Sequence, residues 1–315
     1  MGRRKKGLNT SGWIVFDKPL EMTSTQAVGK MKWLFNANKA GHAGTLDPLA
    51  TGMLPIALGE ATKTVPFVMD GEKVYRFDIS FGVETNTDDR EGEAVKTSDH
   101  RPSQEEILAI LPNYSGEIEQ IPPAYCAIKI NGERAYKLAR DGEDVELEPR
   151  LVVIHDIELV AYDGETATIE VECGKGTYVR SLARDIARDL GTFGHVSSLR
   201  RLAVGPFDEN DMISLAFLEE LRHKTPNFDQ MALNGHFEDI LLPVQTALDD
   251  IPALAVSRQD AVRLKRGQPV LLRGRDAPLI CDTVSVSSDG DLIALGEVDK
   301  GMLKPKRIFN LFTGA

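Results

Sequence analysis

The sequence feature that most constrains the fold is a set of strand-like segments placed around tight-turn signals. Residues 74–81 alternate between polar and apolar side chains, which predicts a strand with one buried face. Segments near 151–160 and 166–173 are also typical of strands, and the Asp163-Gly164 pair between them is typical of a hairpin turn. The apolar run at 53–58 predicts a further, buried strand. A sheet with at least one antiparallel hairpin therefore forms the expected framework.

Helices are predicted where apolar residues recur at helical spacing. The clearest covers residues 178–190, where an apolar stripe follows one side, Thr177 can cap the start and Gly191 can end the helix. Residues 23–35 and 103–111 predict two more helices. Strands and helices together predict a mixed α+β fold.

The last third of the chain has a different pattern. Residues 205–250 show weak periodicity and include a loop-like stretch at 223–234. Beyond about residue 250 there follow a short helix that starts at Ser257, a stop at Gly267 and three strand-like pieces. These pieces cover residues 269–273, 279–286 and 292–298. We therefore expect two domains, one at 1–250 and a small β-rich one at 251–315.

Composition narrows the class of protein. With 42% hydrophobic and 27% charged residues the chain is expected to fold, and no run approaches the 18 apolar residues of a membrane-spanning helix. The basic start of the chain is followed by the polar residues 9–12 rather than by the apolar stretch of a signal peptide. The three cysteines are far apart, and no metal-ligand or nucleotide-loop spacing occurs. We expect a cytoplasmic protein that needs no cofactor and no metal.

The formal net charge of −11 argues at first against a nucleic-acid partner. The charge is uneven, however, because residues 1–80 carry +4 and residues 253–315 carry +3, whereas residues 81–252 carry −18. Within this acidic part, residues 129–140 hold four basic side chains against one acidic, and residues 175–201 hold six against two. A locally basic binding surface is compatible with this distribution, and ordinary solvated faces explain the clusters equally well.

Asp47 is the first candidate for chemistry. It lies in a loop, residues 41–52, whose small residues would let a ligand approach the backbone, although an Asx turn explains the same carboxylate. Arg180 lies in the first turn of a predicted helix, where a cation opposes the helix dipole, so we expect a carboxylate partner elsewhere in the chain. A buried carboxylate held ionised by Arg180 would be a nucleophile or a base. Arg184 and Arg188 follow on the same helix face, where a solvated basic stripe is the simpler interpretation.

Tyr75 is a candidate for binding a ligand rather than for carrying out chemistry. It lies on the apolar face of its predicted strand, and a core tyrosine is the commoner interpretation of such a position. An aromatic ring on a sheet is also a platform on which an unpaired base can stack. No nucleophile-elbow motif supports a Ser-His-Asp triad.

Five separated segments form a recognisable set. The most specific is the loop Gly41-His42-Ala43-Gly44-Thr45-Leu46-Asp47-Pro48-Leu49-Ala50-Thr51-Gly52. The others are residues 17–19, 73–76, 122–125 with Lys129, and 174–182. In this order, over residues 12–206, they resemble the TruB family of bacterial tRNA pseudouridine-55 synthases. The resemblance implies a mixed, largely antiparallel sheet of pseudouridine-synthase type and, at 253–315, a small PUA-like RNA-binding domain.

The resemblance also implies a function and a site. The implied enzyme flips one uridine out of the T-loop of tRNA and isomerises it to pseudouridine without a cofactor. Asp47 would be the nucleophile, Tyr75 would stack on the target base, and Arg180 would pair with Asp47. The further residues implied to contact RNA or to support the site are His42, Tyr178, Leu199, Lys18, Pro19 and Asp89. Lys129 and Arg140 fall in an expected RNA-gripping insertion near 123–150. Transfer RNA is the expected partner, no membrane is involved, and the expected state is a monomer.

Three departures and two alternatives accompany this interpretation. Glu21 stands where the family usually has glycine, Asn86 where aspartate is common, and Cys126 where serine is common.

One alternative function is that of a tRNA-binding or tRNA-folding protein with secondary or absent catalysis. The other is a carboxylate-based N-glycosidase, which would need a second acid near Asp47. The sequence leaves open whether Asp47 attacks C1′ or C6 or first removes a ribose proton.

Overall fold

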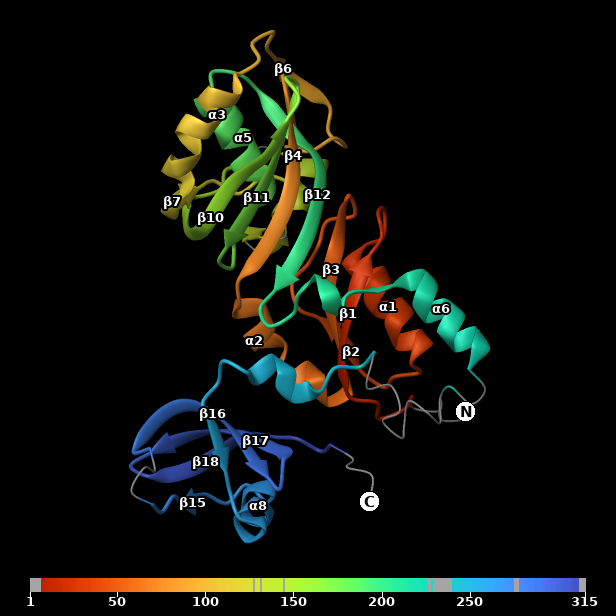
Figure 1. Cartoon of the computed structure of the whole chain (residues 1–315), viewed down its shortest axis with the longest axis vertical. Helices are drawn as coiled ribbons and strands as arrows, with labels where there is room; N and C mark the ends of the chain where they lie inside the picture. The colour runs from red at the N-terminus through yellow and green to blue at the C-terminus, as the bar shows by residue number, and fades with distance from the viewer. Residues whose placement is uncertain are drawn as a thin grey trace.

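The structure is a computed structural model that describes residues 7–126, 128–130, 132–143, 145–225, 228, 240–274 and 278–311. Two large sheets dominate it, one of nine strands and one of five. Figure 1 shows the larger sheet twisting through the upper part of the molecule and the five-stranded C-terminal sheet, in blue, below it. Within the described residues, no helix has the length and apolar character needed to cross a membrane.

The nine-stranded sheet is mixed and largely antiparallel. Its strands are β1 (Gly12–Lys18), β2 (Ala40–His42), β3 (Ala50–Leu58), β4 (Lys73–Phe81), β7 (Gly116–Gln120), β10 (Arg150–Tyr162), β11 (Thr166–Cys173), β12 (Gly194–Val204) and β13 (Ile213–Ser214). They lie in the order β13-β1-β3-β12-β4-β11-β10-β7, and β2 pairs with β3. Only the β1–β13 and β3–β12 pairs of this sheet are parallel. The arrangement confirms the mixed, largely antiparallel sheet expected from the sequence.

Helices bury the apolar faces of this sheet in two main clusters. Helices α3 (Gln104–Ile110) and α5 (Val179–Asp189) pack on β4, β10 and β11, whereas α1 (Ser24–Leu34) and α6 (Leu215–Lys224) pack on β1 and β3. Figure 1 shows these two pairs of helices at separate ends of the sheet. The remaining short elements outside the C-terminal sheet are η1 (Gly59–Lys63), α2 (Val65–Asp70), β5 (Val83–Thr85), β6 (Ala94–Thr97), η2 (Leu111–Tyr114), β8 (Lys129–Ile130), β9 (Glu133–Arg134), α4 (Ala135–Arg140), η3 (Glu209–Asp211) and η4 (Val244–Leu248).

Elements with strong local signals are where the sequence places them. Thr23 caps α1 in the predicted capping box, and β10 and β11 form the predicted hairpin. The predicted cap of α5 is wrong. Its N-cap is Tyr178, while the Thr177 hydroxyl donates to the Gly174 carbonyl instead. The loop-like stretch predicted at 223–234 begins inside α6, and most of it lies outside the described residues.

Strand β12 was not predicted, although it lies at the centre of the sheet. Its pairing with β4 shifts register twice, between Val196 and Ser198 and between Arg201 and Ala203. Each irregularity inserts a residue and breaks the two-residue alternation that identifies a strand in a sequence. Tertiary pairing rather than local pattern therefore forms β12.

The C-terminal sheet has its own apolar core. Its strands lie in the order β14 (Ala253–Ala255), β16 (Ile280–Ser288), β17 (Asp291–Asp299), β18 (Met302–Ile308) and β15 (Val270–Leu271). Helix α8 (Arg258–Lys265) packs on it and is capped by Ser257, the residue at which the sequence predicts a helix to start. The predicted stop at Gly267 is also present, with φ at +79°.

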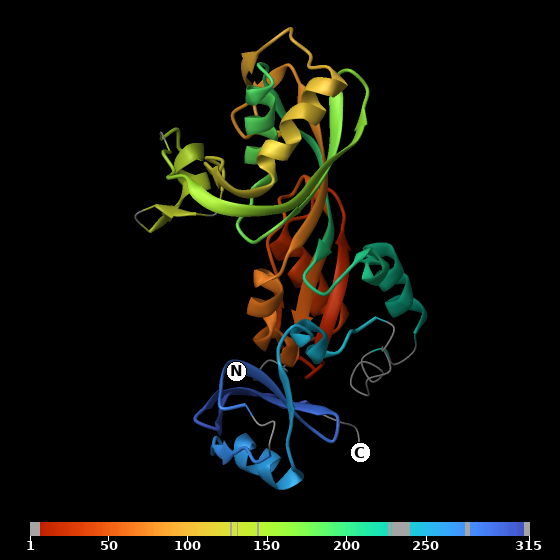
Figure 2. The same cartoon turned by 60° about the vertical axis from the view of Figure 1, so that its left-hand side comes forward.

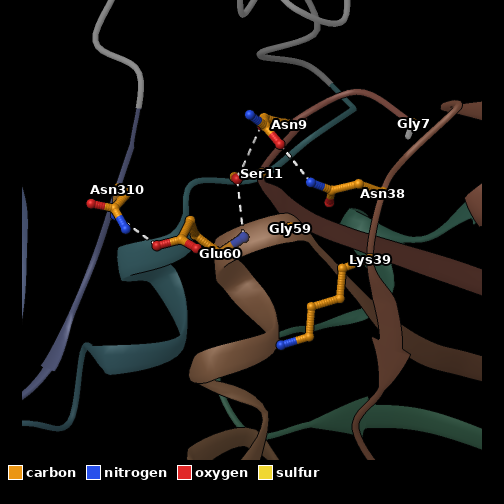
Figure 3. A pocket seen from close by; sticks show the side chains of 8 residues that line it. All are labelled: Gly7, Asn9, Ser11, Asn38, Lys39, Gly59, Glu60 and Asn310. Atoms are coloured by element: carbon orange, nitrogen blue, oxygen red, sulfur yellow. Dashed lines mark hydrogen bonds between the residues drawn. The ribbon is translucent and has the colours of Figure 1, made fainter. Parts of the chain in front are cut away.

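The C-terminal sheet is attached to the large sheet through η1. The Lys63 ammonium donates to the Ile308 carbonyl at 2.7 Å, and the Asn310 backbone N–H donates to Glu60 Oε2 at 2.6 Å. Phe309 is buried in an apolar cluster that includes Trp13. Figure 3 shows the Glu60–Asn310 bond at the edge of an open cavity of about 620 Å³. Polar bonds and apolar packing thus hold the two sheets together.

Candidate functional site

The strand order brings the predicted site residues together from distant parts of the chain. Asp47 lies just before β3, β12 runs beside β3, and β4 lies on the other side of β12. Leu199 of β12 pairs with Ala50 of β3, and Arg201 of β12 pairs with Tyr75 of β4. The missed strand β12 is therefore the element that joins the Asp47 loop to Tyr75.

The loop at residues 41–52 is held by three buried side chains. The Ser24 hydroxyl donates to the Leu46 carbonyl and accepts from the Leu46 N–H, both at 2.9 Å. The Arg201 guanidinium donates to the Gly44 carbonyl at 3.1 Å. The Lys18 ammonium donates to the Pro48 carbonyl at 3.3 Å. Asp47 thus extends from a loop whose backbone is fixed on both sides of it.

Glycine is required at the end of this loop. Gly52 has φ at +93°, and a Cβ there would lie 2.3 Å from the Arg201 carbonyl oxygen. Both the left-handed conformation and the close approach of β12 therefore exclude a larger residue. At Gly52 the small residue therefore serves packing against β12.

Asp47 and Arg180 form an ion pair. Arg180 Nη2 lies 2.9 Å from Asp47 Oδ2, and the arginine side chain is 9% exposed whereas the aspartate side chain is 43% exposed. Two carbonyls, of Thr87 and Tyr125, accept further bonds from the guanidinium at 3.0 Å each. The partner that the helix-dipole argument required for Arg180 is thus Asp47, in an orientation that leaves the carboxylate accessible.

A second carboxylate lies behind Arg180. Asp89 Oδ2 is 3.5 Å from Arg180 Nη1, and the Thr87 hydroxyl donates to Asp89 Oδ1 at 2.6 Å. Asp89 is buried behind Arg180, and its contacts give it a supporting place in the site. The RNA contact implied for Asp89 stays a prediction.

The solvated stripe expected for Arg184 and Arg188 is wrong for Arg184. That side chain is buried, and it lies 3.1 Å from Asp88 and 2.8 Å from Asp185. Arg188 is more exposed, yet its guanidinium makes two 2.8 Å bonds to the buried Glu84. The basic face of α5 therefore binds the acidic segment that follows β4, which fixes Arg180 at the start of the same helix.

A cavity of about 620 Å³ opens beside Asp47. Its lining includes Tyr75, Tyr178, Arg180, Leu199 and Arg201. Tyr75 and Leu199 present apolar surface, while the arginines supply positive charge. The cavity has the size range of small-ligand sites and combines apolar walls with a few polar groups.

Burial sets the protonation of several groups around this cavity. Burial, followed by the positive charge of Arg201, lowers the pKa of His42, so its imidazole is neutral near pH 7. Burial raises the pKa of Tyr75, and it raises that of Tyr178, beside the Cys126 thiol, to about 12, so both phenols keep their protons. Burial lowers the pKa of Lys18 to about 8, although the Asp47 carboxylate acts in the opposite direction.

Comparison with known proteins gives the family. The model of the TruB family pseudouridylate synthase N-terminal domain matches residues 32–179, and that of the tRNA pseudouridylate synthase B C-terminal domain matches residues 180–249. The tRNA pseudouridine synthase B of Bradyrhizobium diazoefficiens is 62% identical over 309 residues, which cover 98% of this chain and 88% of that protein. The chain belongs to the TruB family. It is therefore a pseudouridine synthase, an isomerase that re-forms the bond between uracil and ribose through carbon.

Other relatives carry the same family name, and two solved structures share the fold. The tRNA pseudouridine synthase B of Rhodopseudomonas palustris is 60% identical and that of Brucella ovis 54%, each over 98% of this chain and over 83% and 99% of the relative. The Cbf5–Nop10–Gar1 complex contains a chain that is 24% identical with a TM-score of 0.72 over 98% of this chain and 91% of that one. The archaeal Nop10–Cbf5 complex gives 0.71 at 22% identity over 96% and 87%. These two structures share the fold.

The remaining residues that the TruB resemblance indicates lie in three settings. Lys18 is buried and donates to three backbone carbonyls, a geometry that suits support of the loop, whereas Pro19 is exposed. His42 ends β2, and its buried Nδ1 has no hydrogen-bond partner among the described residues. Lys129 of β8 and Arg140 of α4 are exposed. Figure 2 shows the yellow-green segment that holds β8, β9 and α4, here called the arm, projecting from the sheet. The arm residues do not line the Asp47 cavity.

Two side chains that the sequence reasoning missed organise the TruB site. Arg201 contacts the Asp47 loop and lies with Cζ 6.0 Å from the centre of the Tyr75 ring. Gln120 bonds both the N–H and the carbonyl of Tyr178, at 2.8 and 3.1 Å. Neither has a local sequence signal, because each acts through pairing between distant strands and loops.

The described residues hold no group of three or more His, Cys, Asp or Glu side chains arranged to bind a metal ion.

The departure at Glu21 has a structural consequence, because this residue adopts φ of +65°, a conformation natural to the glycine usual in the family. Its N–H donates to the Pro48 carbonyl at 2.8 Å, next to Asp47.

Proposed function

We propose that this protein isomerises uridine 55 in the T-loop of tRNA, with Asp47 as the nucleophile. The single observation that carries the proposal is the accessible Asp47 carboxylate paired to a buried Arg180 at the mouth of a cavity lined by Tyr75. Relatives that share more than half of this sequence are named tRNA pseudouridine synthase B, which supports tRNA as the substrate.

The residues around the cavity suit each part of the reaction. The uridine has to leave its stack for its C1′–N1 bond to be reached, at a cost of a few kcal/mol. Stacking on the Tyr75 ring and contact with Leu199 offset part of this cost. Arg180 holds the Asp47 carboxylate at 2.9 Å beside the cavity, and a carboxylate is able to attack carbon and to leave again. The arrangement is compatible with attack at C1′ or at C6, or with removal of a ribose proton by Asp47.

The rest of the tRNA is held outside the cavity. The exposed arm that carries Lys129 and Arg140 offers positive charge to the RNA backbone. We assign residues 1–250 to the catalytic domain and residues 251–315 to a PUA-like RNA-binding domain. The protein acts as a cytoplasmic monomer, with tRNA as its partner.

The proposal is tested with a T-stem-loop transcript, the purified protein and no added metal or nucleotide. The wild type forms pseudouridine, and Asp47→Asn forms none, because the amide is a poor nucleophile. Binding of the transcript, measured by gel shift, is unchanged in the variant. Pseudouridine formation by Asp47→Asn at the wild-type rate would refute the role of Asp47.

A further inference from the structure

Arg201 is a buried cation at the back of the TruB site. Its side chain is 1% exposed, and its guanidinium donates to the carbonyls of Met53 at 2.8 Å and Gly44 at 3.1 Å. It also lies against Tyr75, whose ring centre is 6.0 Å from Cζ. One side chain thus connects β3, the Asp47 loop and the proposed base-stacking ring.

The charge of Arg201 has no carboxylate counter-ion within the part of the chain that the structure describes. Among the described residues, no carboxylate lies within 4 Å of its guanidinium, whereas its neighbour Arg200 holds Asp17 at 2.9 and 3.1 Å. Buried charges in proteins are normally paired, because removing an ion from water is costly. Carbonyl groups satisfy the donors of Arg201 but do not cancel its charge.

The uncompensated charge acts on the cavity beside Asp47. Burial lowers the pKa of His42, of Lys18 and of Lys73, and the charge of Arg201 adds to the lowering of all three, which lie on different elements around the site. Arg201 itself lines the cavity that Tyr75 and Asp47 share. The positive charge of Arg201 therefore favours a second negative charge in the site, in addition to that of Asp47.

The isomerisation produces such a charge. On the path in which Asp47 attacks C1′, the electron pair of the broken C1′–N1 bond leaves with the uracil as an anion, and C1′ becomes bonded to the carboxylate. C5 of the anion then forms the new bond to C1′ and displaces the carboxylate, which can take the C5 proton while N1 gains a proton. Preorganised positive groups are most effective where charge develops during a reaction and water is excluded.

We propose that Arg201 is a positioning residue that acts through Tyr75 and the Asp47 loop, and that its unpaired charge stabilises the detached uracil anion. The proposal rests on the proposed function. It distinguishes Arg201 from Arg180, whose charge is shared by Asp47 and Asp89.

The test compares Arg201→Met, which removes the charge, with Arg200→Met, which removes an arginine from the adjacent position of the same strand. Single-turnover rates are measured with T-stem-loops that carry uridine or 5-fluorouridine at the target, as loss of that nucleoside after digestion. Fluorine withdraws electrons, so the detached 5-fluorouracil anion needs less stabilisation.

We expect Arg201→Met to slow the uridine reaction roughly 10²–10³-fold, as loss of one preorganised donor does elsewhere. The factor by which Arg201→Met slows the 5-fluorouridine reaction should be smaller than the factor for uridine by about ten or more. Arg201→Lys should recover part of the lost rate. Arg200→Met should react with both substrates at the wild-type rate. Unfolding curves and RNA affinity of all variants are measured in parallel.

A purely structural role of Arg201 predicts a different result. Arg201→Met would then slow the reactions of both substrates by the same factor. Arg201→Lys would restore the rate only as far as it restores the stability of the fold. These results would overturn the proposal. A wild-type rate in Arg201→Met would overturn it as well. Failure of the proposed function is a separate outcome, because the wild-type protein itself would then leave the uridine unchanged.

Discussion

Ser24 offers the sharpest test of how the Asp47 loop is held. Its hydroxyl makes two 2.9 Å bonds to the backbone of Leu46, the residue before Asp47. Ser24 is 3% exposed and Leu46 is 4% exposed, so water cannot replace these bonds. Ser24→Ala leaves a buried N–H and a buried carbonyl without partners, at about 1–3 kcal/mol each. We therefore expect the free energy of unfolding to fall by roughly 2–6 kcal/mol.

The same change should slow catalysis, because the loop is free to relax and carries Asp47 with it. A displacement of about 1 Å costs on the order of a hundredfold in rate. Urea unfolding and single-turnover pseudouridine formation measure the two effects. The matched control is Thr25→Ala on the exposed side of the same helix, with an expected change in stability below about 1 kcal/mol. If the two variants unfold alike, Ser24 does not hold the loop.

Three further changes test other parts of the account. Glu21→Gly should raise the free energy of unfolding by about 0.5–1 kcal/mol, because glycine adopts the positive φ at no steric cost; lower stability in urea would contradict the strain argument. Burial raises the pKa of Asp88 from 3.8 to about 6, so the folded protein takes up a proton there before the unfolded chain does as pH falls. Wild type should therefore gain about 2 kcal/mol over Asp88→Asn between pH 7 and pH 4.5, and a stability difference that does not change with pH would refute this. Gln120→Ala should free the Tyr178 N–H and speed its hydrogen exchange, with unchanged exchange as the contrary result.

Local patterns predicted the parts of the fold that local physics determines. The capping box of α1, the alternation of β4 and the turn between β10 and β11 are each contained in a few residues, and all three are present. Strand β12 is different, because two bulges hide its alternation and its formation depends on pairing with β3 and β4. The sequence alone could not reveal this strand.

The site residues also divide into those with a local sequence signal and those placed by tertiary contacts. The unfavourable place of Arg180 at a helix start predicted a carboxylate partner, and the structure provides Asp47 at 2.9 Å. The buried ion pairs of Arg184 could not be predicted, because its partner Asp88 approaches only through tertiary packing. Arg201 was missed for a related reason, since in the sequence it is one more basic residue of a strand without a clear pattern.

The most direct test of the central claim is to map modified nucleotides along a full-length tRNA incubated with the protein alone. We predict a single new pseudouridine, at position 55 of the T-loop, and no released uracil. Free uracil would indicate an N-glycosidase instead, and an unmodified tRNA that is nevertheless bound would indicate an RNA-binding protein without catalysis. A pseudouridine elsewhere would contradict the proposed substrate position while leaving the family chemistry intact.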